Sequence, residues 1–289
     1  MAGAQLWQRS AAVTITKRGG SYAGKRLQNL RISFEATKTA GGDPDIHTVT
    51  VWNPSEDTVA LATEKDKYLL LDIAYGADKM ATLLEGDIVS AQLEPAAPDR
   101  KLVIKVGDGY EASKQAGTRA WNPGTSYAQI AQDIANEMKN AKGIIVKGIK
   151  DAFSSPEAKA KAAEAAVNGY AINGNLMKKL AELGDERDVD TDLSDGAISG
   201  VLKNGYTGKA ILLTPNTGLL GYPVREYDKK DKRDYIIAKC LIISTEMRPH
   251  SLFKIDCDTM KVDITAKRIA FQGDTHGNDW TATITGVPI

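Results

Sequence analysis

The chain has 289 residues, of which 42% are hydrophobic and 26% are charged, and its 37 basic side chains balance 37 acidic ones. Domains usually hold about 100–200 residues, so this length predicts a sizeable core in two or more units. The charge balance excludes a global field that would recruit nucleic acid or an anionic membrane. No apolar run reaches the roughly 18 residues of a membrane span, and the first residues lack a secretory pattern, so we expect a soluble chain made in the cytoplasm.

Residues 1–110 have the alternating apolar and polar pattern of short β-strands separated by turns. Asn53-Pro54 ends one of these strands, and Ser55 or Asp57 can cap a helical turn that begins near Glu56. Strands at this spacing favour a small barrel or sandwich. The alternating apolar positions are Val13/Ile15, Leu30/Ile32/Phe34, Val49/Val51, Leu69/Leu71/Ile73 and Leu102/Ile104/Val106.

The middle of the chain changes to a helical pattern. Apolar residues at helical spacing from Tyr127 to Met138 predict one helix, and Thr125 or Ser126 can cap it. Ser155-Pro156 opens an Ala/Lys/Glu stretch, 156–166, that predicts a second helix with little to bury. A third is expected from about Asn175 to Leu183.

The β pattern returns from Lys209 and continues to the end, interrupted by a mixed-charge run, 226–234, that is typical of a solvated loop. Two β regions of similar size therefore bracket the helices, without an exact repeat in the sequence. Cys240 and Cys257 lie among aliphatic neighbours in segments with a strand-like sequence pattern, which predicts two buried free thiols.

Two short motifs could carry chemistry. Gly19 to Arg26 comes within one residue of a phosphate-binding loop, but Arg26 replaces the hydroxyl that binds Mg²⁺, and strand-like text follows where a helix is needed. We therefore expect a hairpin turn there.

The second motif, Gly273-Asp-Thr-His-Gly277, has the Gly-Asp-x-His-Gly signature with which metallophosphoesterases open their metal site. Asp274 and His276 could hold one metal ion. A two-metal enzyme needs further ligands, whereas only a dozen residues follow and the chain has only two other histidines, His47 and His250. Alternating residues on both sides, Ile269/Phe271 and Trp280/Ala282/Ile284, favour a loop between two strands instead.

Several blocks occur in an order that resembles one protein family. They are Val49-Thr-Val-Trp-Asn-Pro-Ser-Glu-Asp-Thr58, Leu69-Leu-Leu-Asp-Ile-Ala-Tyr-Gly76, Leu84-Glu-Gly-Asp-Ile88, Val106-Gly-Asp-Gly-Tyr110, the helix and strands of 167–204, Leu213-Thr-Pro-Asn-Thr-Gly-Leu-Leu-Gly-Tyr-Pro223, and Gly273-Asp-Thr-His-Gly-Asn-Asp-Trp-Thr281. Taken together they resemble the baseplate hub proteins of tailed bacteriophages, the family of the trimeric hub and of the late control protein D type. The sequence departs from that pattern at Pro54, 74–76, 272–273 and 154–166.

Residue by residue, the resemblance implies structural motif positions and no catalytic or cofactor-binding residue. These positions are Asn53, Ser55, Thr58, Gly76, Gly86, Gly109, Thr217, Gly218, Gly221, Pro223, Asp274, Thr275, Gly277, Asp279 and Trp280.

The resemblance also implies a mainly β fold, with two tube-like β-barrel domains, 1–112 and 206–289, that flank an inserted α/β region, 113–205, with three helices. Three chains would form a pseudo-six-fold ring that joins the hexameric tail tube to the central spike and lets DNA pass through its lumen without sequence recognition. The expected partners are two further copies, the tail tube protein, the spike protein and other baseplate proteins, with no cofactor and no membrane. The expected location is the virion baseplate, after synthesis in the host bacterial cytoplasm.

Two other functions stay open at this point. One is a metal-dependent phosphoesterase that uses Asp274 and His276. The other is a carbohydrate-binding tail module, which requires an exposed aromatic patch such as Trp121 or Trp280.

Overall fold

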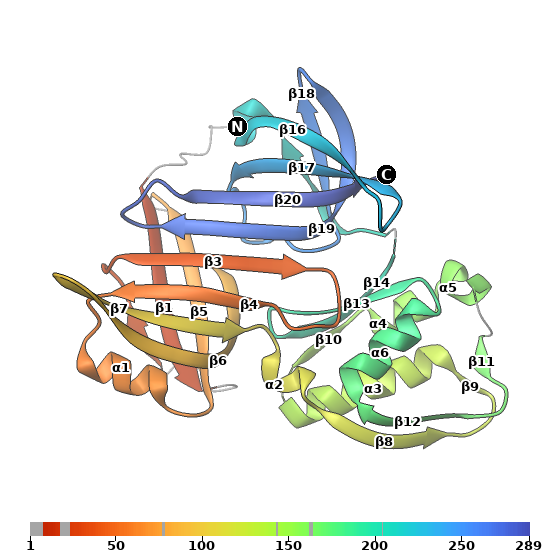
Figure 1. Ribbon diagram of the computed structural model, residues 1–289. Coiled ribbons are helices and arrows are strands. Elements are labelled where there is room, and N and C mark those ends of the chain that lie inside the picture. Colours follow the sequence, from red (N-terminus) through yellow and green to blue (C-terminus); the bar gives the residue numbers. More distant parts are fainter. Residues whose placement is uncertain (1–7, 18–23, 77–78, 143, 162–163, 204) are drawn as a thin grey trace. The chain divides into compact units, whose positions relative to one another are not determined.

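The computed structural model describes residues 8–17, 24–76, 79–142, 144–161, 164–203 and 205–289. The chain folds into two compact units. The larger unit holds the N-terminal and C-terminal β regions, and the smaller unit consists of residues 39–45 and 108–207. Figure 1 labels the helices and strands of both units.

The N-terminal β region of the larger unit contains seven of its strands and one helix, with the sheet order β3-β4-β7-β6-β5-β1-β2. Helix α1, Glu56–Thr63, is capped by Ser55, one of the two caps that the sequence predicts, while Asp57 lies within its first turn. The strands are β1 Arg9–Lys17, β2 Lys25–Leu27, β3 Ile32–Thr39, β4 Ile46–Trp52, β5 Lys67–Tyr75, β6 Ala81–Ala96 and β7 Asp99–Gly107.

The C-terminal β region follows a similar plan, with the order β16-β17-β20-β19, while β18 pairs with β19 and with β15. A 3₁₀ turn, Pro215–Thr217, links its first two strands. The strands are β15 Thr207–Leu213, β16 Leu219–Asp228, β17 Arg233–Leu241, β18 Ser251–Cys257, β19 Met260–Asp274 and β20 Trp280–Pro288.

Strand β19 lies beside β3, and this junction joins both regions into one 13-stranded sheet within the described residues (Figure 1). The two strands run in opposite directions. The mainly β fold with a large antiparallel sheet agrees with the expectation from the sequence, whereas the closed barrels stay a prediction.

The two β regions have the same topology, although their sequences show no exact repeat. Neighbouring strands β3-β4-β7-β6-β5-β1 of the first region correspond, in chain order and in pairing, to β16-β17-β20-β19-β18-β15 of the second. Strand β3 is thus the counterpart of β16, and β6 is the counterpart of β19.

The core of the larger unit lies on one face of the sheet. Successive side chains of a strand point to opposite faces, so every second one enters this core. In β4, for example, Val49 and Val51 are buried while Thr48 and Thr50 are only half-buried. Aromatic residues Phe34, Phe271 and Trp280 fill its centre. Cys240 and Cys257 are both free and buried, which confirms the prediction for the two thiols.

The smaller unit has its own apolar core, formed mainly by helices α3 and α6. Its strands form a three-stranded sheet, β10-β14-β13, and two separate pairs, β9 with β11 and β8 with β12. The helices are α2 Tyr110–Ser113, α3 Tyr127–Lys142, α4 Ile149–Phe153, α5 Pro156–Lys161 and α6 Leu176–Asp185. The strands are β8 Ala116–Trp121, β9 Thr125–Ser126, β10 Ile145–Lys147, β11 Ala165–Ala166, β12 Tyr170–Asn175, β13 Val189–Ser194 and β14 Ala197–Leu202.

The predicted helices at 127–138 and 175–183 are present as α3 and α6. The prediction of one helix over 156–166 was wrong at its C-terminal end, because 165–166 form strand β11 and pair with β9. Most of the stability of a short helix in a protein comes from packing of its apolar side chains, and alanine offers little, so backbone pairing with β9 competes successfully there. The sequence also missed the short helices α2 and α4. Among the described residues no helix is long and apolar enough to cross a membrane.

Candidate functional site

The loop between β19 and β20 is fixed to the start of β3 by an ion pair and by backbone hydrogen bonds. Arg31 donates through Nη2 to Asp274 Oδ2 at 2.7 Å and through Nε to Asp274 Oδ1 at 3.2 Å. The backbone N–H of Thr275 donates to the Ile32 carbonyl, and the N–H of Ile32 donates to Thr275 Oγ1, both at 3.0 Å. The Arg31 guanidinium also lies over the Trp52 ring, 4.4 Å from its centroid.

These contacts decide how the Gly-Asp-x-His-Gly signature is used. Burial alone raises the pKa of Asp274, but the hydrogen bonds from Arg31 and from the His276 backbone N–H, 2.9 Å away, outweigh it and lower the pKa. Both carboxylate oxygens therefore already have donors. His276 Nδ1 lies 3.0 Å from Thr275 Oγ1. In the described part of the chain no group of three or more metal-binding side chains is gathered.

Trp280 directly follows the loop and is fully buried. Its ring makes edge contacts with Phe34, at a centroid distance of 5.4 Å, and with Tyr75, at 6.2 Å. Trp280 is therefore not the exposed aromatic that a carbohydrate-binding module requires. Trp121 is half-buried, and its Nε1 donates to Asp133 at 2.8 Å.

The motif residues near Asn53 form one compact turn. Asn53 adopts a left-handed conformation, with φ of 51°, and its side chain accepts from the Arg100 N–H and donates to Asp99. Ser55 accepts from the N–H of Thr58 as the cap of α1, and the two hydroxyl groups lie 2.9 Å apart. This turn fixes the end of β4 to the β6–β7 hairpin.

The motif residues near Thr217 form a second turn, between β15 and β16. Thr214 and Thr217 cap each other's backbone around the 3₁₀ turn. Gly218 and Gly221 have positive φ angles of 110° and 65°, which favour glycine. Pro223 is buried in β16.

The remaining motif residues lie at separate places. Gly76 follows β5 with a φ of 54°, and Gly109, with a φ of 61°, precedes α2, where a Cβ would overlap Leu193. Gly86 lies in β6 against the Gly107 carbonyl, and Gly277 lies against the Asp274 side chain. The Asp279 carbonyl accepts from the Asp274 N–H at 2.8 Å, which closes the hairpin loop.

The phosphate-loop-like stretch ends in a strand, as the sequence predicts. Lys25–Leu27 form β2, which pairs antiparallel with β1. Residues 18–23, which contain the expected turn, lie outside the described residues. Arg26 pairs with Asp72 of β5 and does not begin a helix.

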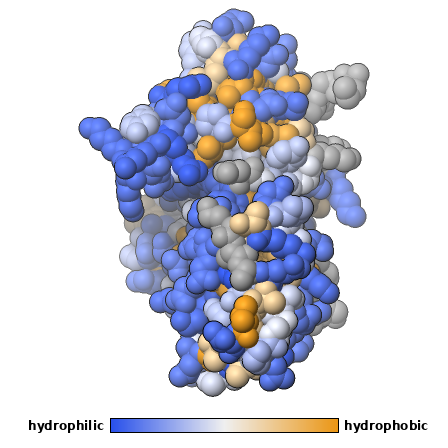
Figure 2. Space-filling model, turned by 90° about the vertical axis from the view of Figure 1, so that its right-hand side faces the viewer, coloured by the Kyte–Doolittle hydropathy of each residue, from blue (hydrophilic) through white to orange (hydrophobic). Residues whose placement is uncertain are grey.

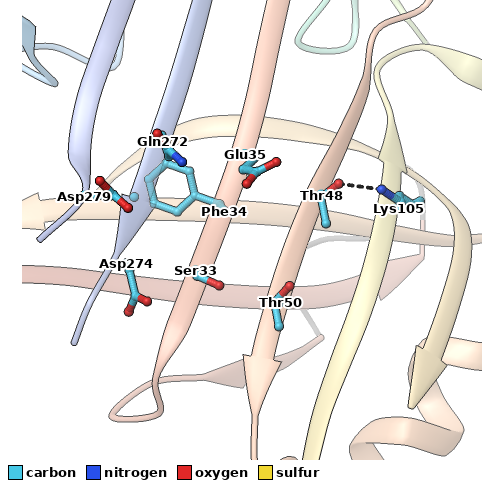
Figure 3. Close-up of a pocket in the computed structure, with 10 residues that line it drawn as sticks. Ser33, Phe34, Glu35, Thr48, Thr50, Lys105, Gln272, Asp274 and Asp279 are labelled. Carbon is cyan, nitrogen blue, oxygen red and sulfur yellow. Dashed lines mark hydrogen bonds between the residues drawn. The ribbon is translucent and has the colours of Figure 1, made fainter. Parts of the chain in front are cut away.

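Beside the closing hairpin, the second face of the sheet is polar and carries a shallow groove of about 340 Å³ (Figure 3). A neighbouring groove of about 280 Å³ continues the same face across β20 and β17. Only a few ionised side chains line the two grooves, and they are of both signs. The polar lining residues are Ser33, Glu35, Thr37, Thr48, Thr50, Lys105, Lys239, Gln272, Asp274, Asp279, Thr281 and Thr283.

The residue that holds the closing loop, Arg31, was missed by the sequence analysis. It is 243 positions away from Asp274, and no local pattern connects the two residues. The polar face left a clearer signal, because Thr281, Thr283 and Thr285 alternate with buried residues along β20.

Comparisons with known proteins show which fold this is. No family model matches the chain, and no curated protein matches it. Among solved structures, the tail protein from Neisseria meningitidis MC58 superposes with a TM-score of 0.65 at 10% identity, over 96% of both chains. The 43 kDa tail protein of prophage MuSo2 from Shewanella oneidensis superposes with a TM-score of 0.61 at 10% identity, over 96% of this chain and 97% of that one.

A third similar structure is the E. coli c3393 protein, a component of the type VI secretion system with structural similarity to T4 bacteriophage tail proteins gp27 and gp5. It superposes with a TM-score of 0.61 at 11% identity, over 95% of this chain and 76% of that one. The chain therefore has the fold of these phage-type tail proteins and of a type VI secretion-system component.

Proposed function

We propose that this protein is a structural hub of a bacteriophage tail baseplate, a homotrimer that joins the hexameric tail tube to the central spike. The observation that carries the proposal is the shared fold, which extends over nearly the full length of two tail proteins. The ordered sequence blocks that resemble hub proteins support it independently. The proposed location is the virion, and the proposed partners are the tube, the spike and other baseplate proteins.

The polar face of the larger unit's sheet is the surface that we assign to the lumen. Six hydroxyl side chains line its two grooves, and the ionised groups among the lining residues are Glu35, Asp274 and Asp279 against Lys105 and Lys239. Arg31 neutralises Asp274. Tight non-specific binding of DNA depends on Lys and Arg contacts to phosphates, so grooves whose lining residues have no basic excess suit passage rather than capture.

The coverage of the similar structures favours a tail over a secretion system. The chain covers almost all of the two tail proteins but 76% of the E. coli secretion-system component. In a tail, the same proposal includes the passage of DNA through the ring.

No observation favours the phosphoesterase, because the Asp274 carboxylate is engaged by Arg31 and by the loop backbone. Metal analysis and a phosphodiesterase assay of the wild type and His276→Ala distinguish the two functions. Stoichiometric metal together with activity that is lost in His276→Ala would overturn the structural role.

The mass of the purified protein in solution tests the proposed hub. We expect a species of three times the 31.1 kDa chain mass in light scattering. A protein that stays monomeric at all concentrations, also when mixed with its tube and spike proteins, contradicts the proposal.

A further inference from the structure

The two β regions can be compared residue by residue, because the same bulge interrupts both. In β6 the pairing with β5 ends at Asp87, and a bulge follows at Val89 in the pairing with β7. In β19 the pairing with β18 covers Thr265, and a bulge follows at Lys267 in the pairing with β20. Val89 therefore corresponds to Lys267.

A close contact of a glycine beside the bulge, present in both β regions, supports the same alignment. A Cβ on Gly86 would lie 2.9 Å from the Val106 side chain, and a Cβ on Gly286 would lie 2.9 Å from the Ile264 side chain. Gly86 is the counterpart of Ile264, and Val106 is the counterpart of Gly286. Each region therefore has one glycine at this pair of facing positions. It lies on β6 in the first region and on β20, the counterpart of β7, in the second.

Beyond the bulge, the two equivalent strands have different neighbours. The C-terminal half of β19 lies between β20 and β3, so Phe271 is only 2% exposed. Within the described residues, the corresponding half of β6, residues 88–96, pairs with β7 alone. Leu93, the counterpart of Phe271, is 40% exposed, and Val89 is 38% exposed. This part of β6 is an open strand edge with apolar side chains.

The second open edge belongs to β16, the counterpart of β3. Strand β3 lies between β4 and β19, whereas β16 pairs only with β17 in the described part of the chain. Its exposed side chains include Tyr222, Val224 and Tyr227, with exposures of 72%, 58% and 58%. Figure 2 is turned about the vertical axis of Figure 1, so the β15 to β20 region lies in its upper part, where hydrophobic side chains are exposed.

The two open edges are counterparts of the two strands that join inside the chain. We infer that β16 of one copy pairs antiparallel with residues 88–96 of β6 in a second copy, which repeats the β3–β19 junction between chains. An open edge with apolar side chains favours strand pairing with another chain. Pro95 of β6 and Pro223 of β16 each lack a backbone N–H, so the pairing between copies has fewer hydrogen bonds than the β3–β19 junction. Each copy offers one edge of each kind, so the contact is head-to-tail and closes into a ring when the rotation allows it.

This inference rests on the proposed hub and names the surface through which its copies join. It also predicts which residues face each other. Val224 pairs with Ile237 in the second region as Glu35 pairs with Thr48 in the first, and Ile237 and Thr48 are equivalent, so Val224 is the counterpart of Glu35. Glu94 of β6 is the counterpart of Gln272 of β19. Glu35 and Gln272 line the same two grooves of the β3–β19 junction. Val224 of one copy should therefore lie close to Glu94 of the next.

A cysteine pair tests this register. Val224→Cys combined with Glu94→Cys should form a disulfide between copies under mild oxidation, while Val224→Cys combined with Lys261→Cys, an exposed position at the far end of β19, should not. Non-reducing gels separate the products. A cross-linked closed trimer supports both the junction and the hub, and a cross-linked open ladder supports the junction but contradicts the trimer. Trimers by mass without this cross-link overturn the junction alone, and a persistent monomer overturns both.

A charge placed in the edge gives a second readout. Leu93→Asp is tolerated in a monomer, since Leu93 is partly exposed, but in the junction it buries a carboxylate and should weaken assembly at least ~10-fold. Val167→Asp, at an exposed apolar residue of the smaller unit, is the matched control and should assemble as the wild type does. Equal assembly of Leu93→Asp and wild type would refute the inference.

Discussion

The ion pair between Arg31 and Asp274 makes the most specific stability prediction, because it connects the start of β3 to the closing loop. The Arg31 side chain is 41% exposed and that of Asp274 is 15% exposed, so solvent screens part of the attraction. After this discount, a two-pronged Arg–carboxylate pair contributes about 1 kcal/mol. Asp274→Asn should lower the free energy of unfolding by that amount. Asp274→Ala also removes the acceptor of the His276 N–H and should cost about 2 kcal/mol.

The assay is urea unfolding followed by tryptophan fluorescence, at one fixed protein concentration because assembly adds to the apparent stability. Asp279→Asn is the matched control, since it makes the same charge change in the same loop at an exposed side chain. Its effect should stay within about 0.5 kcal/mol. The reasoning is refuted if Asp274→Asn and Asp279→Asn have the same unfolding free energy.

The pH dependence of this difference has a defined sign. The pKa of Asp274 is lowered in the folded state, so the folded protein binds the proton less readily than the unfolded chain does. The stabilisation is therefore complete above the ordinary aspartate pKa of 3.8 and is lost as the pH falls through the lower, folded value. The difference in unfolding free energy between wild type and Asp274→Asn should be constant from pH 7 to about 5. It should become smaller at more acidic pH.

Three further predictions concern the core. Gly273→Ala should destabilise by about 1–3 kcal/mol in the same urea assay, because its Cβ would overlap the buried Phe34 ring, and an unchanged midpoint would contradict this packing. Trp280→Ala should cost about 3–5 kcal/mol as a cavity opens between Phe34 and its neighbours, and a loss below 1 kcal/mol would show that the ring is not in the core. Burial raises the pKa of Cys240 to about 12, whereas a hydrogen bond with Thr259 lowers the pKa of Cys257. At pH 8 iodoacetamide should therefore alkylate Cys257 faster than Cys240, as followed by mass spectrometry. Equal rates of alkylation would contradict this difference in pKa.

The strands were predictable from the sequence wherever one face is buried. Val49 and Val51 alternate with Thr48 and Thr50, and the period alone predicts both the strand and its core face. Helix α6 was predictable for a similar reason, since Leu176, Leu180 and Leu183 lie on one side and are buried. Two cysteines in strand text were correctly expected to be free.

Long-range pairing was not predictable in the same way. The β3–β19 junction joins segments more than 200 residues apart, and neither strand carries a local signal for its partner. The repeat of the two β regions was hidden because equivalent positions share topology but not residue type, as Leu93 and Phe271 or Gly86 and Ile264 show. Strand β11 was missed since backbone pairing, which side-chain periodicity does not report, decides its structure.

The central claim is that three copies form a ring around a polar lumen, and electron microscopy of the purified protein tests it most directly. End-on class averages should show a ring with three-fold symmetry, a central hole and a diameter close to that of the tail tube. Averages that show single compact particles without a hole, at concentrations where the mass is also monomeric, would contradict the claim.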